Sequence, residues 1–274
     1  MEIVTAESRR IERLYHYQRF DRSRLEELLR TRSIFLSDAS RFNDPWDCKP
    51  YFDFTRLDDP VFYERQVQWL DRAARKNTAY LSEEEFRRRA ARLRSDRPFL
   101  ERMIHDMATV SDEMERRYRV YCLTTNPTST LMWSHYAQNH TGICLGFRCR
   151  NHVFGSALRV EYSETFPLID LADDGMEASL LPFLAKSADW SYEEEYRLIA
   201  QEEAEMNADD TLITRSNMLP IPEGALACIV VGCLMLESER EVVRRLIQEH
   251  AQGVQLQQAV RVPNHYQLTL ETLI

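Results

Sequence analysis

The sequence predicts a mixed α/β protein with a central mixed sheet, a helical insertion at about residues 56–119, and a C-terminal strand-helix-strand unit. Three observations carry this prediction. Short apolar, strand-like segments stand on both sides of a helical middle third, that middle third repeats apolar residues at helix spacing, and the tail reads as strand, helix and strand. With 274 residues, 44% of them hydrophobic, the chain can bury one large core, so we expect a single domain.

The N-terminal part combines short strands with one helix. Residues 14–17 are predicted as a strand, and Ser23 with Glu26 three residues later is typical of a capping box that starts a helix. Residues 33–37 are the next predicted strand. Residues 42–47, F-N-D-P-W-D, predict a turn, because Asn and Asp bond to nearby backbone and Pro fixes φ.

Residues 56–119 are predicted to form three helices packed on one another. Apolar residues recur there at helical spacing: Tyr63, Val67, Leu70 and Ala74; Phe86, Ala90 and Leu93; Met103, Met107, Val110 and Met114. The segment carries 15 Lys and Arg against 13 Asp and Glu, and its arginines between 87 and 97 offer a basic stripe. Glu83, Glu84 and Glu85 each precede an arginine by four residues, which favours a solvated helix face over a nucleic-acid patch.

The remaining elements return to strand patterns. Residues 119–124, 142–147 and 158–162 are predicted strands, and Ser129 is predicted to cap a short helix. The tail then gives a strand at 228–231, a helix at 238–250 and a strand at 254–260, which fits a right-handed crossover between parallel strands.

Composition excludes several classes of function. The net charge of −9 argues against a general affinity for nucleic acid or anionic lipid. No segment approaches the roughly 20 apolar residues of a membrane helix, and the N-terminus has no signal-peptide core, so we expect a cytoplasmic protein. The six cysteines form no C-x-x-C pair and are predicted to be reduced and mostly buried. The glycine-rich motifs of dinucleotide-binding folds and P-loops, and the G-x-S-x-G motif of hydrolases, are absent.

Residues 190–197, W-S-Y-E-E-E-Y-R, form the densest chemical constellation in the chain. A strand over residues 192–199 would place Glu193, Glu195 and Arg197 on one face, because side chains alternate along a strand. Such a row can organise a sugar hydroxyl or a developing cation. It can equally be a structural ion-pair network, with Trp190 closing the core beside it.

Residues 133–136 offer aromatic groups on a short helix. Trp133 and Tyr136 are three apart and share a face, which indicates core packing or a stacking platform. His135 and His140 are five apart, outside the i, i+4 register in which one helix face presents two metal ligands. We therefore expect no metal.

Three polar residues of the turn at 42–47 are further candidates. Asn43, Asp44 and Asp47 are read as turn and capping residues, and the sharper alternative makes Asp47 a polar lid over a ligand. Lys186 is read as a solvated or paired charge, or as a phosphate contact.

Four segments are specific when taken together: L-Y-H-Y from Leu14, F-N-D-P-W-D from Phe42, L-M-W-S-H-Y-A with G-I-C-L-G-F, and K-S-A-D-W-S-Y-E-E-E-Y-R from Lys186. In this order and spacing they resemble a bacterial domain-of-unknown-function family, the one numbered twenty-nine seventy-one. The residues that carry the resemblance are Leu14, Tyr15, Tyr17, Phe42, Asn43, Asp44, Pro45, Asp47, Trp133, Tyr136, Gly142, Lys186, Trp190, Tyr192, Glu193, Glu195 and Arg197. The chain departs from the family at His16, where lysine is more common, and in the length of its helical insertion.

The chain also resembles, more loosely, the NAD-dependent ADP-ribosyltransferase-like fold, which has no glycine-rich phosphate loop. This resemblance implies an early-strand residue at the adenosine, an aromatic that stacks on nicotinamide, and a late strand with an E-x-E pair. It therefore implies NAD as a substrate and a nucleotide-like small molecule as the partner. Tyr15 or His16 would take the first role, and Tyr136 or Trp133 the second. Further candidates for ligand contacts are Tyr17, Asn43, Asp47, Lys186 and Trp190.

The chemistry that this resemblance implies makes physical demands on the E-x-E pair. Breaking the bond between nicotinamide and ribose develops an oxocarbenium-like cation, which a fixed carboxylate stabilises in a water-poor site. Glu195 would bond the 2′-hydroxyl and offset the cation, Glu193 would position or deprotonate an acceptor, and Arg197 would pair with Glu195 or meet a phosphate. A pocket bounded by Glu195, Tyr136 and Tyr15 would favour this function.

Two other classes of function stay open. The first is a non-enzymatic effector or scaffold that binds another protein through residues 56–119, and the absence of a shared pocket would favour it. The second is a nuclease that holds metal ions with Asp44, Asp47, Glu193 and Glu195, and carboxylates at metal-bridging distance would favour that.

Overall fold

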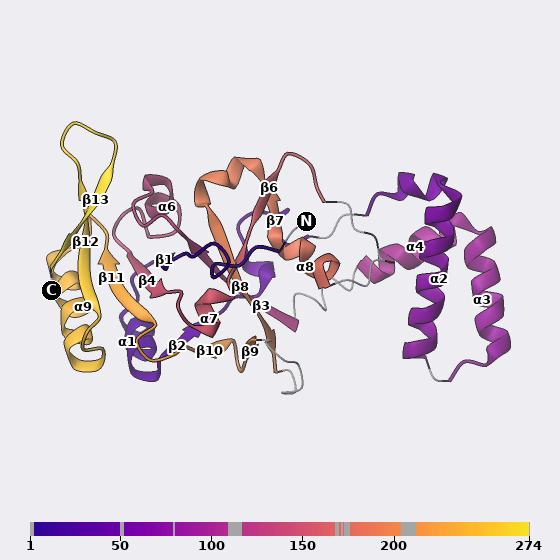
Figure 1. The fold of residues 1–274 in the computed structure, drawn as a ribbon, viewed down its shortest axis with the longest axis horizontal. Helices are drawn as coiled ribbons and strands as arrows, with labels where there is room; N and C mark the ends of the chain where they lie inside the picture. Colours follow the sequence, from indigo (N-terminus) through magenta and orange to yellow (C-terminus); the bar gives the residue numbers. More distant parts are fainter. Residues whose placement is uncertain are drawn as a thin grey trace.

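The computed structural model describes residues 3–49, 52–78, 80–108, 117–167, 170, 172, 176–203 and 212–273. It has the predicted mixed α/β architecture, with a nine-stranded mixed sheet at its centre, helices against the sheet, and a separate group of helices at one end (Figure 1). Within these ranges no helix combines the length and the apolar character needed to cross a membrane.

The large sheet joins strands from the whole length of the chain. Its order is β13 (Leu268–Thr272), β12 (Gln255–Arg261), β11 (Leu226–Val231), β4 (Ile143–Arg148), β1 (Arg13–Gln18), β3 (Tyr118–Thr124), β8 (Glu195–Glu202) and β5 (Leu158–Arg159), and β9 (Leu212–Thr214) also pairs with β8. Two small sheets pair β2 (Ser33–Phe35) with β10 (Met218–Pro220), and β6 (Glu161–Ser163) with β7 (Ala185–Ser187). The predicted C-terminal unit is confirmed, since β11 and β12 are parallel and α9 (Glu237–His250) lies between them in the chain.

The two faces of the sheet bury different cores because side chains alternate along each strand. On one face, residues such as Leu14 and Phe147 pack against α1 (Arg22–Thr31), α9 and α7 (His152–Gly155). On the other face, Tyr17 and Cys144 pack against Trp133 of α6 (Thr130–His135), whose predicted cap is confirmed: the Ser129 side chain accepts a hydrogen bond from a backbone N–H of the first turn. The six cysteines are all unpaired, and four of them are buried, as predicted.

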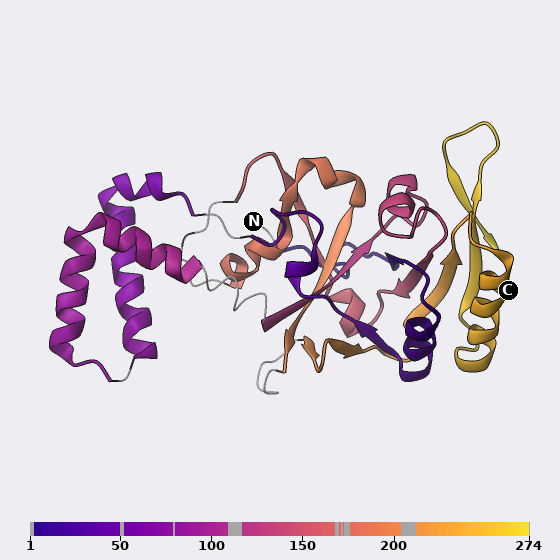
Figure 2. The same ribbon diagram turned by 180° about the vertical axis from the view of Figure 1, so that it is seen from behind.

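The helical insertion forms a unit with its own core. It comprises η2 (Phe54–Asp58), α2 (Pro60–Asn77), α3 (Glu83–Ser95) and α4 (Arg97–Ala108), and Figure 2 shows it from behind at the end of the molecule away from α9. Its core is made by Leu57, Val67, Leu70, Leu93, Leu100 and Ile104. The three predicted helices are thus confirmed up to residue 108, and the predicted core positions Val110 and Met114 lie outside the described residues.

Charge pairs cover the outer face of α3 much as predicted. Arg87 and Arg88 lie 3.8 and 3.1 Å from the glutamates four residues before them. Glu85 takes a different role, because its carboxylate accepts hydrogen bonds from the backbone N–H and the hydroxyl of Ser82, completing a capping box. Other arginines of the basic stripe pair with neighbouring elements, since Arg94 pairs with Glu64 of α2 and Arg97 pairs with Glu101 of α4.

The start of α1 differs from the prediction. The helix begins one residue earlier than Ser23, and Asp21 is its N-cap: Asp21 Oδ1 accepts a hydrogen bond from the Arg24 backbone N–H at 3.1 Å. An aspartate at this position competes directly with a serine two residues later, and both residue types are good caps.

Two strand predictions also need correction. Residues 158–162 split into β5, which pairs with β8, and β6, which pairs with β7. The strand predicted over 192–199 begins only at Glu195, because Ala188–Glu193 forms the 3₁₀ helix η3. That helix ends at Glu194, which adopts a left-handed φ of 46°. The remaining helices are η1 (Ala39–Arg41) and α8 (Met176–Leu184).

Candidate functional site

Strand β8 places the chemical groups of the constellation on the α6 face of the sheet. Glu195 pairs with Thr124 of β3, and Thr124 pairs with Tyr15 of β1, so these three residues stand in one row across neighbouring strands. Directly paired residues point to the same face. Arg197, two residues after Glu195, points to that face as well, as predicted.

Glu193 reaches the same cluster by a different route from the one predicted. It closes η3 rather than extending β8, and the left-handed Glu194 turns the chain between them. Glu193 and Glu195 consequently meet at a common cation, the ammonium of Lys186. Lys186 belongs to β7, which pairs with β6 outside the large sheet.

Arg197 is the centre of the cluster and is fully buried. Its Nε and Nη2 donate to the two carboxylate oxygens of Glu195 at 2.8 and 2.9 Å, and its Nη1 and Nη2 donate to the two oxygens of Asp47 at 2.9 and 2.7 Å. Nη1 also donates to the backbone carbonyl of Phe183 at 2.8 Å. Every N–H of the guanidinium thus has an acceptor, and the geometry is bidentate to both carboxylates. Arg197 therefore joins β8, the turn at 42–47 and the end of α8.

Lys186 is the second cation of the cluster, with a side chain that is 5% exposed. Its Nζ lies 2.5 Å from Glu193 Oε2, 3.1 Å from Glu195 Oε2 and 3.5 Å from Asp47 Oδ2. The ammonium also lies 5.2 Å from the centroid of the Trp190 ring, within the range of a cation–π contact. We call these five residues, Asp47, Lys186, Glu193, Glu195 and Arg197, the charged network.

Two tyrosines complete the hydrogen bonds of the charged network. The Tyr136 hydroxyl donates to Glu193 Oε1 at 2.6 Å, and it also bonds the Asn43 side chain. The Tyr162 hydroxyl accepts from the backbone N–H of Glu195 at 2.9 Å. Tyr136 therefore takes part in the site as a hydrogen-bond donor, whereas its predicted neighbour Trp133 is fully buried and donates to the backbone carbonyl of Pro127.

The charged network shifts the pKa values of its two glutamates in opposite directions. Burial alone would raise the pKa of Glu195, but Arg197 and Lys186 outweigh it and lower that pKa to about 2. The pKa of Glu193 is raised, because burial and the neighbouring Glu195 charge outweigh its bonds to Lys186 and Tyr136. Burial would lower the pKa of Lys186, yet Glu195 and Glu193 raise it well above the usual value, so its side chain stays an ammonium.

The carboxylates converge on protein cations rather than around a space for a metal ion. Asp47, Glu193 and Glu195 all have their oxygens within reach of Lys186, and Asp47 and Glu195 are also bonded to Arg197. The part of the chain that the structure describes contains no group of three or more His, Cys, Asp and Glu side chains arranged to hold a metal. The remaining carboxylate of the nuclease reading, Asp44, accepts the backbone N–H of Trp46 at 2.9 Å, as a turn residue does.

A cavity of about 290 Å³ opens beside the charged network. Two of the five network residues line it, Asp47 and Lys186, whose side chains are 2% and 5% exposed. Two exposed aromatic residues also line it: Trp46, 62% exposed, and Phe166, 40% exposed. The other lining residues are Asp44, Lys49, Ser163, Glu164, Thr165, Pro167, Pro182, Ala185, Ser187 and Asp189. We call this the network cavity.

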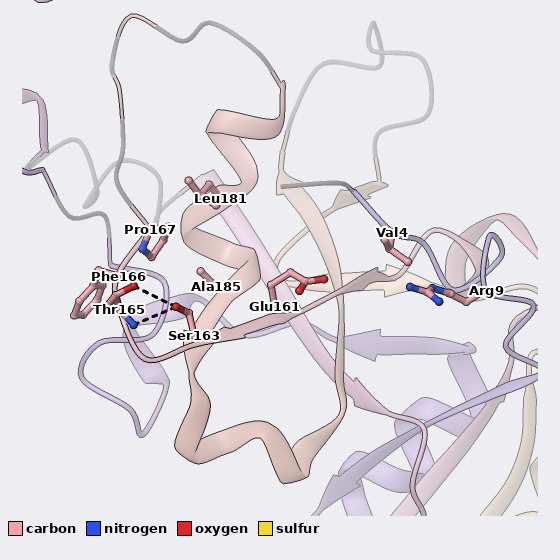
Figure 3. Close-up of a pocket in the computed structure, with 9 residues that line it drawn as sticks. All are labelled: Val4, Arg9, Glu161, Ser163, Thr165, Phe166, Pro167, Leu181 and Ala185. Carbon is pink, nitrogen blue, oxygen red and sulfur yellow. Dashed lines mark hydrogen bonds between the residues drawn. The ribbon is translucent and has the colours of Figure 1, made fainter. Parts of the chain in front are cut away.

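A second cavity of about 490 Å³ shares a wall with the network cavity, formed by Ser163, Thr165, Phe166, Pro167 and Ala185 (Figure 3). Neither of these two cavities is lined by Tyr15, Tyr136 or Glu195. The pocket expected from the ADP-ribosyltransferase resemblance is therefore not one of them.

The early-strand residues lie away from the network cavity. Tyr17 is buried, packs edge-on against Trp133 with ring centroids 5.1 Å apart, and donates to the Asn126 carbonyl. Tyr15 is half-buried in the same cluster. His16 points to the opposite face of the sheet, where it stacks on Tyr121 with ring centroids 4.0 Å apart. A strand cannot direct consecutive side chains into one site, so His16 does not share a site with Tyr15 and Tyr17.

Sequence reasoning identified Asp47 and Lys186 as candidate ligand contacts but missed other residues of the cavity walls. Trp46 was identified only as part of a motif, although a large aromatic residue inside a polar turn is a signal for exposure at a site. The strip from Ser163 to Pro167 gave no signal, because nothing local in it distinguishes a cavity wall from an ordinary loop. Cys48 was likewise missed, and its sulfur lies 3.2 Å from Arg197 Nη1.

Comparison with known proteins gives one match. No curated protein and no solved structure is similar to this chain. The matching family model covers residues 132–198, which include most of α6 and four of the five network residues, and excludes Asp47 and Tyr15. The resemblance found in the sequence is thereby confirmed for this segment: residues 132–198 match the family described as protein of unknown function (DUF2971).

Proposed function

We propose that this protein binds a nucleotide-like small molecule in the network cavity and acts on NAD as an enzyme of the ADP-ribosyltransferase type. One observation carries the proposal. Lys186 and Asp47, two members of a buried network of five charges, form the wall of a cavity whose other walls include the exposed rings of Trp46 and Phe166. Charged groups held in fixed positions beside aromatic faces are typical of small-molecule sites.

The lining of the network cavity suits a ligand with a flat ring and mixed charge. Trp46 and Phe166 offer faces for stacking, and Lys186 offers an ammonium for a phosphate. Lysines contribute two positive charges to the lining, and aspartates and glutamate contribute four negative ones. The negative groups suit the cationic nicotinamide ring of NAD, and the two lysines are the groups in the lining that can offset its diphosphate.

In this proposal the E-x-E pair positions other groups and does not touch the substrate. Glu195 does not line the network cavity, and its oxygens are bonded to Arg197 and Lys186. Asp47 is the network carboxylate at the cavity wall, so it is the group placed to offset an oxocarbenium-like charge on ribose. Glu193 and Glu195 hold the Lys186 ammonium in place. The unpaired cysteines fit a reducing compartment, and we place this chemistry in the cytoplasm.

NAD binding to wild type and to Trp46→Ala tests the proposal directly. Trp46 is mostly exposed, so its truncation removes a stacking face with little effect on folding. Tyr266→Ala is the matched control, because Tyr266 is a fully exposed aromatic that does not line the cavity. Loss of one aromatic stack is worth about 1–3 kcal/mol, or about 5- to 150-fold in Kd measured by titration calorimetry.

NAD binding and release of nicotinamide are measured separately, and each can refute its own part of the proposal. Failure of wild type to bind NAD, or equal affinities of wild type and Trp46→Ala, would refute the ligand assignment. Binding without release of nicotinamide over prolonged incubation would refute the transferase chemistry and leave a binding protein.

The helical unit supports a second candidate function, a scaffold that binds another protein. Residues 54–108 have their own hydrophobic core, distinct from the cores that pack on the large sheet. A partner that docks there should protect amides of α2 and α3 from hydrogen exchange and leave those around Trp46 unchanged. The opposite pattern of protection would exclude this function.

A further inference from the structure

The cavity in Figure 3 shares one wall with the network cavity and differs from it in four lining residues: Val4, Arg9, Glu161 and Leu181. It lies between the N-terminal segment, which contributes Val4 and Arg9, and the strip that follows β6. None of the five residues of the charged network lines it. A ligand in this cavity can be tested separately from NAD, because Val4, Arg9 and Leu181 do not line the network cavity.

Most of this lining is apolar. Val4, Phe166, Pro167, Leu181 and Ala185 contribute hydrocarbon surface. The hydroxyl of Ser163 is engaged locally, since it accepts a hydrogen bond from the Thr165 backbone N–H at 3.1 Å. Pockets of a few hundred Å³ with apolar walls and few polar groups are the usual form of a small-molecule site.

Two charged residues line the cavity, Arg9 and Glu161. Arg9 makes no ion pair within the described residues, whereas Glu161 lies 3.9 Å from Arg159 and has a cation of its own. Figure 3 shows the Arg9 guanidinium at the end of the cavity opposite the Phe166 ring. An anion placed there would gain a charge-assisted hydrogen bond.

The backbone that carries Arg9 is fixed to the rest of the protein. Ala6 donates its N–H to the Ala157 carbonyl at 2.8 Å, and Thr5 forms a β-bridge with Leu158 of β5. Thr5 and Ser8 also exchange hydrogen bonds between backbone N–H groups and hydroxyls. Because this turn is held in place, little ordering of backbone is needed when a ligand meets Arg9.

We propose that this cavity binds an apolar carboxylic acid, with its carboxylate at Arg9 and its hydrocarbon body along Val4, Leu181 and Phe166. The cationic end and the apolar walls match the two parts of such a ligand. A neutral hydrocarbon gains nothing from Arg9, and an amphiphilic amine meets a like charge there.

Calorimetric titration of the full chain with decanoate tests this site, with decylamine as the charge-reversed probe. Wild type should bind decanoate saturably and decylamine at least tenfold more weakly. Arg9→Gln should weaken decanoate binding about three- to tenfold, the loss of one partly solvated charge-assisted contact. Arg10→Gln is the matched control, because it removes the same charge from the adjacent residue, which does not line the cavity.

A second variant tests the apolar part of the site. Leu181→Ala removes hydrocarbon from the wall and should weaken decanoate binding by a further factor of about three to ten, with the discrimination against decylamine unchanged. Three results would each overturn the proposal: no saturable binding of decanoate to wild type, equal binding of decanoate and decylamine, or equal losses in Arg9→Gln and Arg10→Gln.

Discussion

Replacing Arg197 by methionine should be among the most destabilising substitutions in this protein. The side chain is fully buried and donates hydrogen bonds to Asp47, Glu195 and the Phe183 carbonyl. Methionine fills similar volume and removes the charge, so two buried carboxylates lose their bidentate partner. Breaking a buried pair from one side costs about 3–5 kcal/mol, and we expect the free energy of unfolding at pH 7 to fall by that amount.

The pH dependence of the stability loss in Arg197→Met shows whether the unpaired carboxylate charge causes it. In wild type the pKa of Glu195 is about 2, below its ordinary value of about 4.5, so its contribution to stability is present above pH 4.5 and is lost as the pH falls toward 2. Without Arg197, burial raises the pKa of that carboxyl, and protonation then relieves the unpaired charge. The deficit of Arg197→Met relative to wild type should therefore shrink as the pH is lowered from 7 to 4.

Urea unfolding followed by circular dichroism measures the free energy of unfolding of each variant at pH 7 and at pH 4. Arg94→Met is the matched control, because Arg94 forms a comparable ion pair with Glu64 at 2.8 Å while its side chain is 50% exposed. Exposed pairs contribute under about 1 kcal/mol, so this control should lose little at any pH. A loss for Arg197→Met that is no larger than that of Arg94→Met, or that does not change with pH, would refute the account of the charged network.

Two further substitutions test other parts of the site. His16 is buried, and burial lowers its pKa from 6.5 to about 4, so the folded state loses stability as the pH falls from 6.5 toward 4. His16→Gln removes the titrating group and should therefore reduce the fall in Tm over this pH range. A fall in Tm equal to that of wild type would contradict this explanation. Tyr136→Phe removes the hydroxyl that donates to Glu193 Oε1 at 2.6 Å, and should cost about 1–3 kcal/mol in urea unfolding at pH 7. A cost below about 0.5 kcal/mol would mean that water replaces the phenol.

Local patterns in the sequence were sufficient for most of the fold. The strand, helix, strand tail and the three helices of residues 56–108 were predicted correctly, because each has a clear apolar period and nearby caps. Errors fell where two local signals competed. Asp21 and Ser23 are both good caps, and the segment before Glu195 alternates like a strand while forming a 3₁₀ helix.

The candidate site was predictable in its members and not in its arrangement. Alternation along β8 correctly put Glu195 and Arg197 on one face. Asp47 was identified only as a turn residue with a possible role over a ligand, because no local pattern indicates that a residue 150 positions away will be its partner. The sequence also gave no means to tell that Glu195 would be bonded on both oxygens and withdrawn from the cavity.

The sequence by itself determined which segments are strands and helices, which side chains alternate to the same face, and which residues carry the family resemblance. These properties depend on neighbours within a few positions, where backbone periodicity and capping decide the outcome. Only the tertiary structure decided that Lys186 and Asp47, rather than Tyr15 and Tyr136, line the network cavity. That result depends on the order of strands in the sheet and on the pairing of distant charges, and burial makes such pairing strong because water no longer competes for the same groups.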